Sequence, residues 1–193
     1  MDTVVYFDFA GGRGEALRQM YRYAKVEFTD KRVKGETWPA MQKEGLEDGT
    51  LPFGQLPVVH FAKEDRWVAQ SRSLLQLVGE RLGLAPKDDK GKVSAMQLLD
   101  CAEDMTSRLY TGMRLKREGS ALPDAMAAKN TKDCIMMAKC MDKMISGPYT
   151  CGAEPCYADF AMASLVALMG QLERTDIIEA CPKLRAMANL FQQ

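Results

Sequence analysis

The sequence predicts two domains of different class, an α/β layer in the first 82 residues and an all-α helical bundle after residue 91. Three observations predict this division. Strand-like and helix-like periodicities alternate up to residue 82, residues 83–91 are polar and rich in turn formers, and only helix-like periodicity follows. We therefore expect a first domain at 1–82, a linker at 83–91 and a second domain at 92–193.

The first domain is expected to form a thioredoxin-like β-α-β…β-β-α layer. Short β-branched or aromatic runs predict strands, a charged turn between two such runs predicts an antiparallel hairpin, and apolar side chains at helical spacing predict helices. A mixed sheet with helices on its faces is the architecture that this order favours. The expected strands are residues 3–7, 26–33, 56–61 and 67–68, the expected helices are 14–24 and 71–82, and an irregular stretch separates the second and third strands.

The second domain is expected to hold four or five helices. Long segments rich in Ala, Met, Leu and Lys carry no strand signal. Turn-forming residues interrupt them at 118–123, 147–148, 154–155 and 181–182.

Charge and cysteine usage exclude several classes of protein. The 26 basic residues balance the 26 acidic residues, which argues against a polyanion binder. No apolar run is long enough to span a bilayer and no signal peptide is evident, so we expect a cytoplasmic protein. All six cysteines follow residue 100 without a CxxC pair, and His60 is the only histidine. A zinc site, a catalytic triad and thioredoxin-type redox chemistry in the first domain are therefore not expected.

Three short strings carry a family resemblance. They are Tyr6-Phe7 with Arg13-Gly14-Glu15-Ala16-Leu17-Arg18, then Phe53-Gly54-Gln55-Leu56-Pro57-Val58, then Gln70-Ser71-Arg72-Ser73-Leu74-Leu75. Together they resemble the cytosolic glutathione S-transferases of the tyrosine-type classes, most closely the sigma class. The resemblance runs from Thr3 to about Leu190. It implies a cytoplasmic homodimer that conjugates reduced glutathione to small apolar electrophiles, with no metal, no nucleic acid and no membrane partner.

The resemblance makes Tyr6 the catalytic residue. A free thiol has a pKa near 8.5, and the thiolate is the nucleophile. A phenolic hydroxyl can donate a hydrogen bond to the thiolate and so favour the charged form. The alternative is that Tyr6 is an ordinary core residue of a strand.

The resemblance also implies a set of glutathione-binding residues. Pro57 resembles the family's cis-proline, which leaves the backbone of Leu56 free to pair with the peptide, although a trans proline at an edge strand is the general alternative. Ser71 lies at a helix N-terminus, where an anion is favoured, or it serves only as a cap. The implied residues are Arg13, Trp38, Lys43, Gln55, Leu56, Pro57, Gln70, Ser71 and, from the partner subunit's helix, Asp104.

The sequence departs from the family pattern at several places. One extra residue stands near Gly11-Gly12, Lys43 comes one residue late, and extra residues follow it up to Thr50. Cys156 occupies a helix cap where the family has Ser or Thr, which weakens the cap while Asp159 keeps its place. Family members usually continue for one more helix, so we expect an open electrophile site with weak selection among substrates.

The electrophile pocket is expected to combine side chains of both domains. Its implied residues are Phe7, Phe9, Met105, Tyr110 and Met113. For Asp104 the alternative role is a surface ion pair with Arg108 one helical turn later. Two alternative functions stay open: a non-catalytic structural or ligand-carrying protein of the same fold, and a glutathione-dependent isomerase of the prostaglandin D synthase type.

Overall fold

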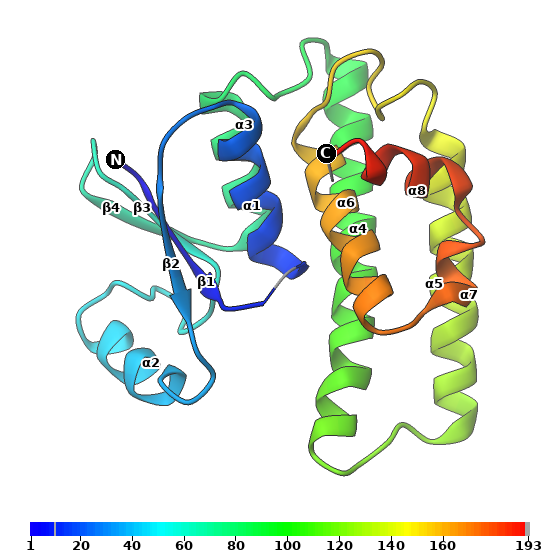
Figure 1. The fold of residues 1–193 in the computed structure, drawn as a ribbon, viewed down its shortest axis with the longest axis horizontal. Helices are drawn as coiled ribbons and strands as arrows, with labels where there is room; N and C mark the ends of the chain where they lie inside the picture. The colour runs from blue at the N-terminus through cyan, green and yellow to red at the C-terminus, as the bar shows by residue number, and fades with distance from the viewer. Residues whose placement is uncertain (10, 192–193) are drawn as a thin grey trace. The chain divides into compact units, whose positions relative to one another are not determined.

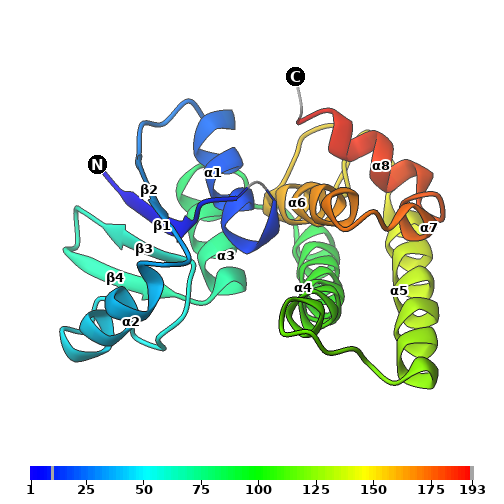
Figure 2. The same cartoon turned by 60° about the horizontal axis from the view of Figure 1, so that its bottom comes forward.

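The chain divides into two units, Met1–Ala85 and Pro86–Gln193, in a computed structural model that describes residues 1–9 and 11–191 (Figures 1 and 2). The first contains a four-stranded sheet with three helices, and the second contains helices α4 to α8. This confirms the predicted order of a thioredoxin-like layer followed by an all-helical domain.

The sheet of the first unit has the strand order β2-β1-β3-β4. Strand β1 pairs in parallel with β2 and antiparallel with β3, and β3 forms the predicted antiparallel hairpin with β4. The second strand starts at Thr29, later than expected. The elements are β1 Thr3–Phe7, α1 Gly12–Tyr23, β2 Thr29–Val33, α2 Trp38–Glu47, β3 Val58–Phe61, β4 Arg66–Ala69 and α3 Ser71–Arg81.

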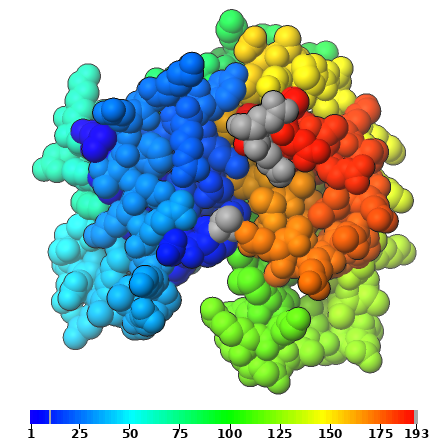
Figure 3. Space-filling model, in the orientation of Figure 1, coloured from blue at the N-terminus to red at the C-terminus, as the bar shows by residue number. Residues whose placement is uncertain are grey.

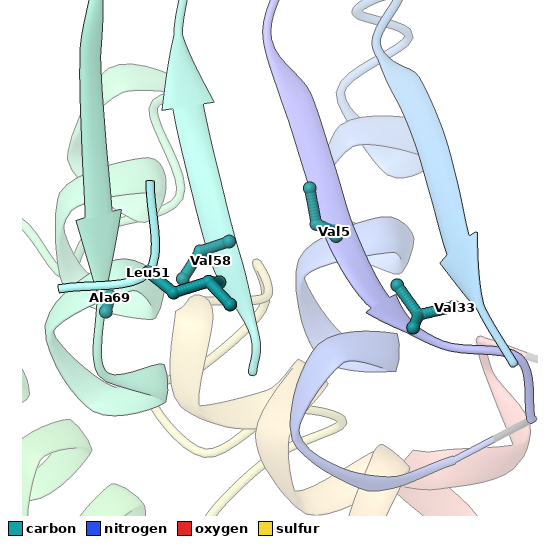
Figure 4. Close-up of a cluster of buried hydrophobic side chains, with 5 residues drawn as sticks. All are labelled: Val5, Val33, Leu51, Val58 and Ala69. Carbon is teal, nitrogen blue, oxygen red and sulfur yellow. The ribbon is translucent and has the colours of Figure 1, made fainter. Parts of the chain in front are cut away.

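The two faces of the sheet are covered by different helices. Helices α1 and α3 lie side by side on one face (Figures 1 and 2). The other face carries an apolar cluster that α2 covers with Trp38 and Met41. Because successive side chains of a strand alternate between faces, neighbouring residues of β1 serve different layers. Figure 4 shows the buried members of this cluster, Val5, Val33, Leu51, Val58 and Ala69.

Helix α2 overturns the expectation of an irregular stretch after the second strand. Pro39 lies at the start of the helix, where a missing backbone N–H costs nothing. The helix ends at Asp48, whose Oδ1 accepts hydrogen bonds from the amide and the hydroxyl of Thr50. Gly45 is its only fully buried residue, so the apolar periodicity that identifies a helix is weak. Much of the helix faces solvent at the lower corner of Figure 3.

The second unit is built around a buried helix. Helix α6 has 11 buried residues of its 15, and helices α4, α7 and α8 pack against it. Helix α4 begins three residues before the predicted start of the second domain at residue 92, because Asp88 caps it by accepting a hydrogen bond from the amide of Gly91 at 2.7 Å. The helices are α4 Asp89–Arg117, α5 Asp124–Met144, α6 Tyr157–Gln171, α7 Thr175–Ile178 and α8 Pro182–Asn189.

The cap of α6 relies on Asp159, as its position three residues after Cys156 predicted. Oδ2 of Asp159 accepts from the amide of Cys156 and Oδ1 accepts from the amide of Thr150, both at 2.8 Å. The carboxyl group is fully buried, and this burial raises its pKa against the lowering effect of the two amides. None of the described helices is both long and apolar enough to cross a membrane.

Candidate functional site

Tyr6 lies near the end of β1 with its ring enclosed on several sides. Only 3% of the residue is exposed. The ring centroids of Phe7 and Phe9 lie 5.6 and 5.4 Å from that of Tyr6, and the backbone of Gly14 in the first turn of α1 lies directly against the ring. A side chain at position 14 would overlap Cβ and Cγ of Tyr6. The glycine of the first family string therefore makes room for the tyrosine.

Arg18 is a buried cation beside Tyr6 that the sequence did not single out. Its guanidinium carbon lies 5.7 Å from the Tyr6 ring centroid. Nε donates to Asp30 at 2.8 Å, Nη1 to Glu15 at 3.2 Å and Nη2 to the carbonyl of Phe7 at 3.3 Å. The guanidinium thus ties α1 to β2 and to the end of β1. Buried charges are tolerated when they are paired in this way, so Arg18 fixes the strand end that carries Tyr6.

Two glycines with positive φ angles precede Arg13, where the sequence has its extra residue. Gly11 and Gly12 have φ angles of 80° and 73°, values that L side chains adopt with difficulty. Helix α1 starts at Gly12, and Arg13 and Gly14 follow in its first turn. Arg13 is half-buried and keeps its place directly before Gly14. The left-handed backbone therefore lies at the two glycines, and Arg13 is already helical.

A second group of implied residues gathers between β3 and α3. The Leu56-Pro57 peptide bond is cis, as the resemblance implies, and the strand pairing of β3 begins only at Val58. Nε2 of Gln70 lies 3.5 Å from Oε1 of Gln55. Gln55 and Gln70 are both exposed, so their amides form a polar surface beside the free backbone of Leu56.

Gln70 has a strained backbone at the N-terminus of α3. Its φ and ψ angles of 74° and 107° lie outside the regions that non-glycine residues favour. Such strain concentrates at functional sites and persists only where the surrounding structure imposes it. Ser71 begins the helix with its side chain buried, and no side chain caps this end. The orphan amides and the helix dipole favour a carboxylate here.

Trp38 and Lys43 lie on different faces of helix α2. Trp38 packs against the apolar cluster of the sheet, whereas Lys43 is exposed. The Trp38 ring packs edge-on against Phe7 at 5.3 Å between centroids. Among the described residues, no group accepts a hydrogen bond from the indole N–H of Trp38. Lys43 lies five residues on, about 140° around the helix, whereas Gln42 shares the Trp38 face. Gln42 donates to the carbonyl of Gly54 at 2.7 Å and so holds α2 to the turn before Gln55.

The implied residues of the second unit have varied surroundings. Asp104 is exposed on α4, and Arg108 pairs with Asp133 of α5 at 3.5 Å instead of with Asp104. Met105 is completely buried, Tyr110 is half-buried, and 38% of Met113 is exposed. Met113 lines a cavity of about 670 Å³ between α4 and α5. Met105 and Met113 therefore differ in exposure.

Sequence reasoning missed Arg18 and Gln42. Arg18 falls among the apolar residues Leu17, Met20 and Tyr21, and a charged residue on a buried stripe is the signal that could have found it. Gln42 offered no such signal, because the helix that orients it was not expected. Within residues 1–9 and 11–191, no three His, Cys, Asp or Glu side chains lie close enough together to hold a metal ion.

Comparisons with known proteins show what the whole chain is similar to. No protein-family model matches the chain. Glutathione S-transferase 1 of Ascaris suum is 27% identical over 170 residues, which cover 85% of this chain and 78% of that protein. Mouse hematopoietic prostaglandin D synthase is 27% identical over 104 residues, 52% of this chain and 46% of the synthase. A monomeric glutathione S-transferase of Necator americanus superimposes with a TM-score of 0.78 at 22% identity, covering 97% of this chain and 89% of that chain, and shares its fold.

Proposed function

The chain belongs to the cytosolic glutathione S-transferase family, in the sigma-like class to which hematopoietic prostaglandin D synthase is related, and on this basis we propose that it conjugates reduced glutathione to apolar electrophiles. The observation that carries the proposal is that the first unit contains both Tyr6, whose ring packs against Gly14, and the Gln55–Gln70 surface at the start of α3. The pairing of Val5 with Val58 brings the end of β1 beside the start of β3. One group would activate a thiol and the other would hold the peptide that carries it.

In the proposed reaction Tyr6 stabilises the glutathione thiolate. Its hydroxyl donates a hydrogen bond to the sulfur, and the thiolate attacks the electrophilic carbon and displaces the leaving group or adds to the double bond. Lowering the thiol pKa by about 2 units requires roughly 2.7 kcal/mol of preference for the charged sulfur. A charge-assisted hydrogen bond in a largely buried site is of this order. The enclosed ring of Tyr6 supports the role, since a hydroxyl that is already positioned loses no free energy to reorganisation.

The peptide part of glutathione is proposed to bind across the first unit. The backbone of Leu56, beside Pro57, pairs with the cysteinyl residue as an added strand. The γ-glutamyl carboxylate binds at Ser71 and Gln70, and the indole N–H of Trp38 donates to the glycine carboxylate. Gln55 and Arg13 border this path. Lys43 contributes little to this site, because it lies on the other side of α2.

The test combines affinity retention with a conjugation assay. The protein should bind to immobilised glutathione, elute with free glutathione, and conjugate an aromatic electrophile. Tyr6→Phe should still be retained but should conjugate about 10- to 1,000-fold more slowly. Tyr23→Phe, at the exposed C-terminal end of α1, is the control and should keep its activity. Retention without any conjugation by the wild type would instead identify a non-catalytic carrier.

The relationship to a prostaglandin synthase favours a second candidate, an isomerase that uses glutathione without consuming it. The same Tyr6 and glutathione site would serve this reaction. The two candidates differ in the fate of the thiol. With an endoperoxide substrate, an isomerase leaves the glutathione concentration unchanged, whereas a transferase lowers it by one molecule per turnover.

We also propose a two-fold homodimer in which Asp104 reaches the α-amino group of glutathione in the partner subunit. Its exposure on α4, and the pairing of Arg108 with Asp133 instead, support this role. The Necator americanus relative described as monomeric makes the test necessary. Sedimentation should give a dimer. Asp104→Ala should weaken glutathione binding and leave the dimer intact. A monomer with full activity would contradict this assignment.

A further inference from the structure

The loop before α6 brings two cysteine sulfurs into contact. Sγ of Cys151 lies 3.8 Å from Sγ of Cys156, and both residues are free thiols. The hydroxyl of Thr150 is within 3.5 Å of the Cys156 sulfur and 3.9 Å of the Cys151 sulfur. A disulfide needs a further approach of roughly 1.8 Å, which is within the range of side-chain rotation.

The backbone holds both cysteines in this position. Cys151 lies in a tight turn closed by reciprocal hydrogen bonds between Tyr149 and Gly152, at 3.2 and 3.4 Å. The carboxylate of Asp159 then binds the amides of Thr150 and Cys156 with its two oxygens. One buried side chain therefore fixes the segments that carry both sulfurs. The two sulfurs are therefore already in contact in the folded chain.

The two thiols differ in access. Cys156 is 2% exposed, whereas Cys151 is half-buried and its thiol donates to the carbonyl of Gly91 at 3.5 Å. Burial, and the nearby carboxylate of Asp159, raise the pKa of the Cys156 thiol. An external reagent therefore meets Cys151 first, and Cys156 is placed to react with whatever Cys151 has formed.

We propose that Cys151 and Cys156 form a redox modification site that closes to an intramolecular disulfide by exchange with a small disulfide such as oxidised glutathione. The Cys151 thiolate attacks one sulfur of the small disulfide, whose S–S bond breaks and releases one small thiolate. The Cys156 sulfur then attacks Cys151 in the mixed disulfide and releases the second. Two protein thiols are oxidised, one small disulfide is reduced to two thiols, and these take up the two protons.

The experiment incubates the full chain with glutathione disulfide and reduced glutathione at graded ratios, alkylates the remaining thiols and maps the peptides by mass spectrometry. The expected result is an intact mass lower by two hydrogen atoms, with a peptide that links Cys151 to Cys156 and is released by dithiothreitol. A mixed disulfide that persists on Cys151, a link between other cysteines such as Cys101 and Cys140, or alkylation of all six cysteines at every ratio would overturn the proposal.

Three cysteine variants test the assignment and distinguish a lost link from a folding defect. Cys156→Ser supplies a hydroxyl at the cap, a residue that helix N-termini favour, so it should fold, and its oxidation should stop at a mixed disulfide on Cys151. Cys151→Ser should abolish the link and leave Cys156 reduced. Cys140→Ser removes an exposed thiol of α5 and should leave the link intact. The link is expected even in Tyr6→Phe, where conjugation is slowed, which separates this inference from the proposed function.

Discussion

Gly14 and Tyr6 are in such close contact that no side chain fits between the first turn of α1 and the tyrosine ring. The overlapping atoms would be Cβ and Cγ of Tyr6, the part of the side chain nearest the backbone, which cannot yield by a simple rotation. The helix start and the proposed catalytic hydroxyl are therefore positioned by the same contact.

Gly14→Ala should displace the Tyr6 ring and lower the conjugation rate more than it lowers glutathione retention. The overpacking should also cost about 1–3 kcal/mol of the free energy of unfolding. Chemical denaturation and steady-state kinetics measure the two effects. Gly112→Ala in α4 is the matched control, because a Cβ there meets no atom within 4 Å, and it should be neutral or slightly stabilising. An active Gly14→Ala enzyme would show that the contact does not position Tyr6.

Arg18→Met should destabilise the first unit strongly. Removing the guanidinium leaves Glu15 and Asp30 without their buried partner, and breaking such a pair costs about 3–5 kcal/mol. Arg22→Met removes an arginine that pairs with the same Glu15 but is 52% exposed, so it should cost at most about 1 kcal/mol. Urea unfolding of the two variants compares them directly. Equal losses would contradict the role given to Arg18.

The backbone of Gln70 gives a prediction that separates stability from binding. Gln70→Gly should relieve the strain of the positive φ, whereas Gln70→Ala keeps it and only removes the side-chain amide. We expect the glycine variant to be about 1 kcal/mol more stable than the alanine variant, and both to bind glutathione more weakly. Thermal melts and titration calorimetry measure these quantities. Unchanged glutathione affinity in both would remove Gln70 from the binding site.

Asp159 predicts an unusual dependence of stability on pH. Burial raises its pKa in the folded protein, so the folded state binds its proton more tightly than the unfolded state does. The free energy of unfolding should therefore fall as the pH rises from the ordinary carboxyl range, about 4, through the raised pKa. Asp159→Asn should remove this slope. Denaturation across pH tests it, and a slope that survives in the variant would belong to another group.

The pKa of Asp133 is shifted in the opposite direction to that of Asp159. Its hydrogen bond from Lys129 lowers its pKa, so its contribution to stability is present above the ordinary carboxyl range and is lost as the pH falls. This pair lies on the surface, where such contributions are small. Asp133→Asn should therefore change the acid side of the profile slightly and leave the Asp159 slope in place.

Most of the fold could be predicted from the sequence, because the patterns that identify its helices and strands are local. The β-branched run that includes Val4 and Val5, the turn before β4 and the helical stripe of α3 each specify one element, and their order specifies the layer. Helix α2 was not accessible, since it buries Gly45 fully and rests on only two half-buried apolar side chains, Trp38 and Met41. Its stability comes from the cluster beneath it, a tertiary effect that periodicity does not record.

The residues of the candidate site could be predicted from the sequence only where they lie in the family strings. Tyr6, Gln55 and Gln70 lie in those strings, but nothing in the spacing shows that the amides of Gln55 and Gln70 meet or that Gln70 is strained. The partners of Arg18 come from α1, β1 and β2, so its role exists only after the chain has folded. The position of Lys43 on α2 depends on extra residues whose conformation the sequence left open.

The pKa of the glutathione thiol in the bound complex tests the central claim most directly. The ultraviolet absorbance of the thiolate is titrated against pH with glutathione bound to the wild type and to Tyr6→Phe. The account predicts a thiol pKa about 2 units below the free value near 8.5 in the wild type, and a return toward that value when the hydroxyl is removed. The same thiol pKa in both proteins would contradict the assignment of Tyr6.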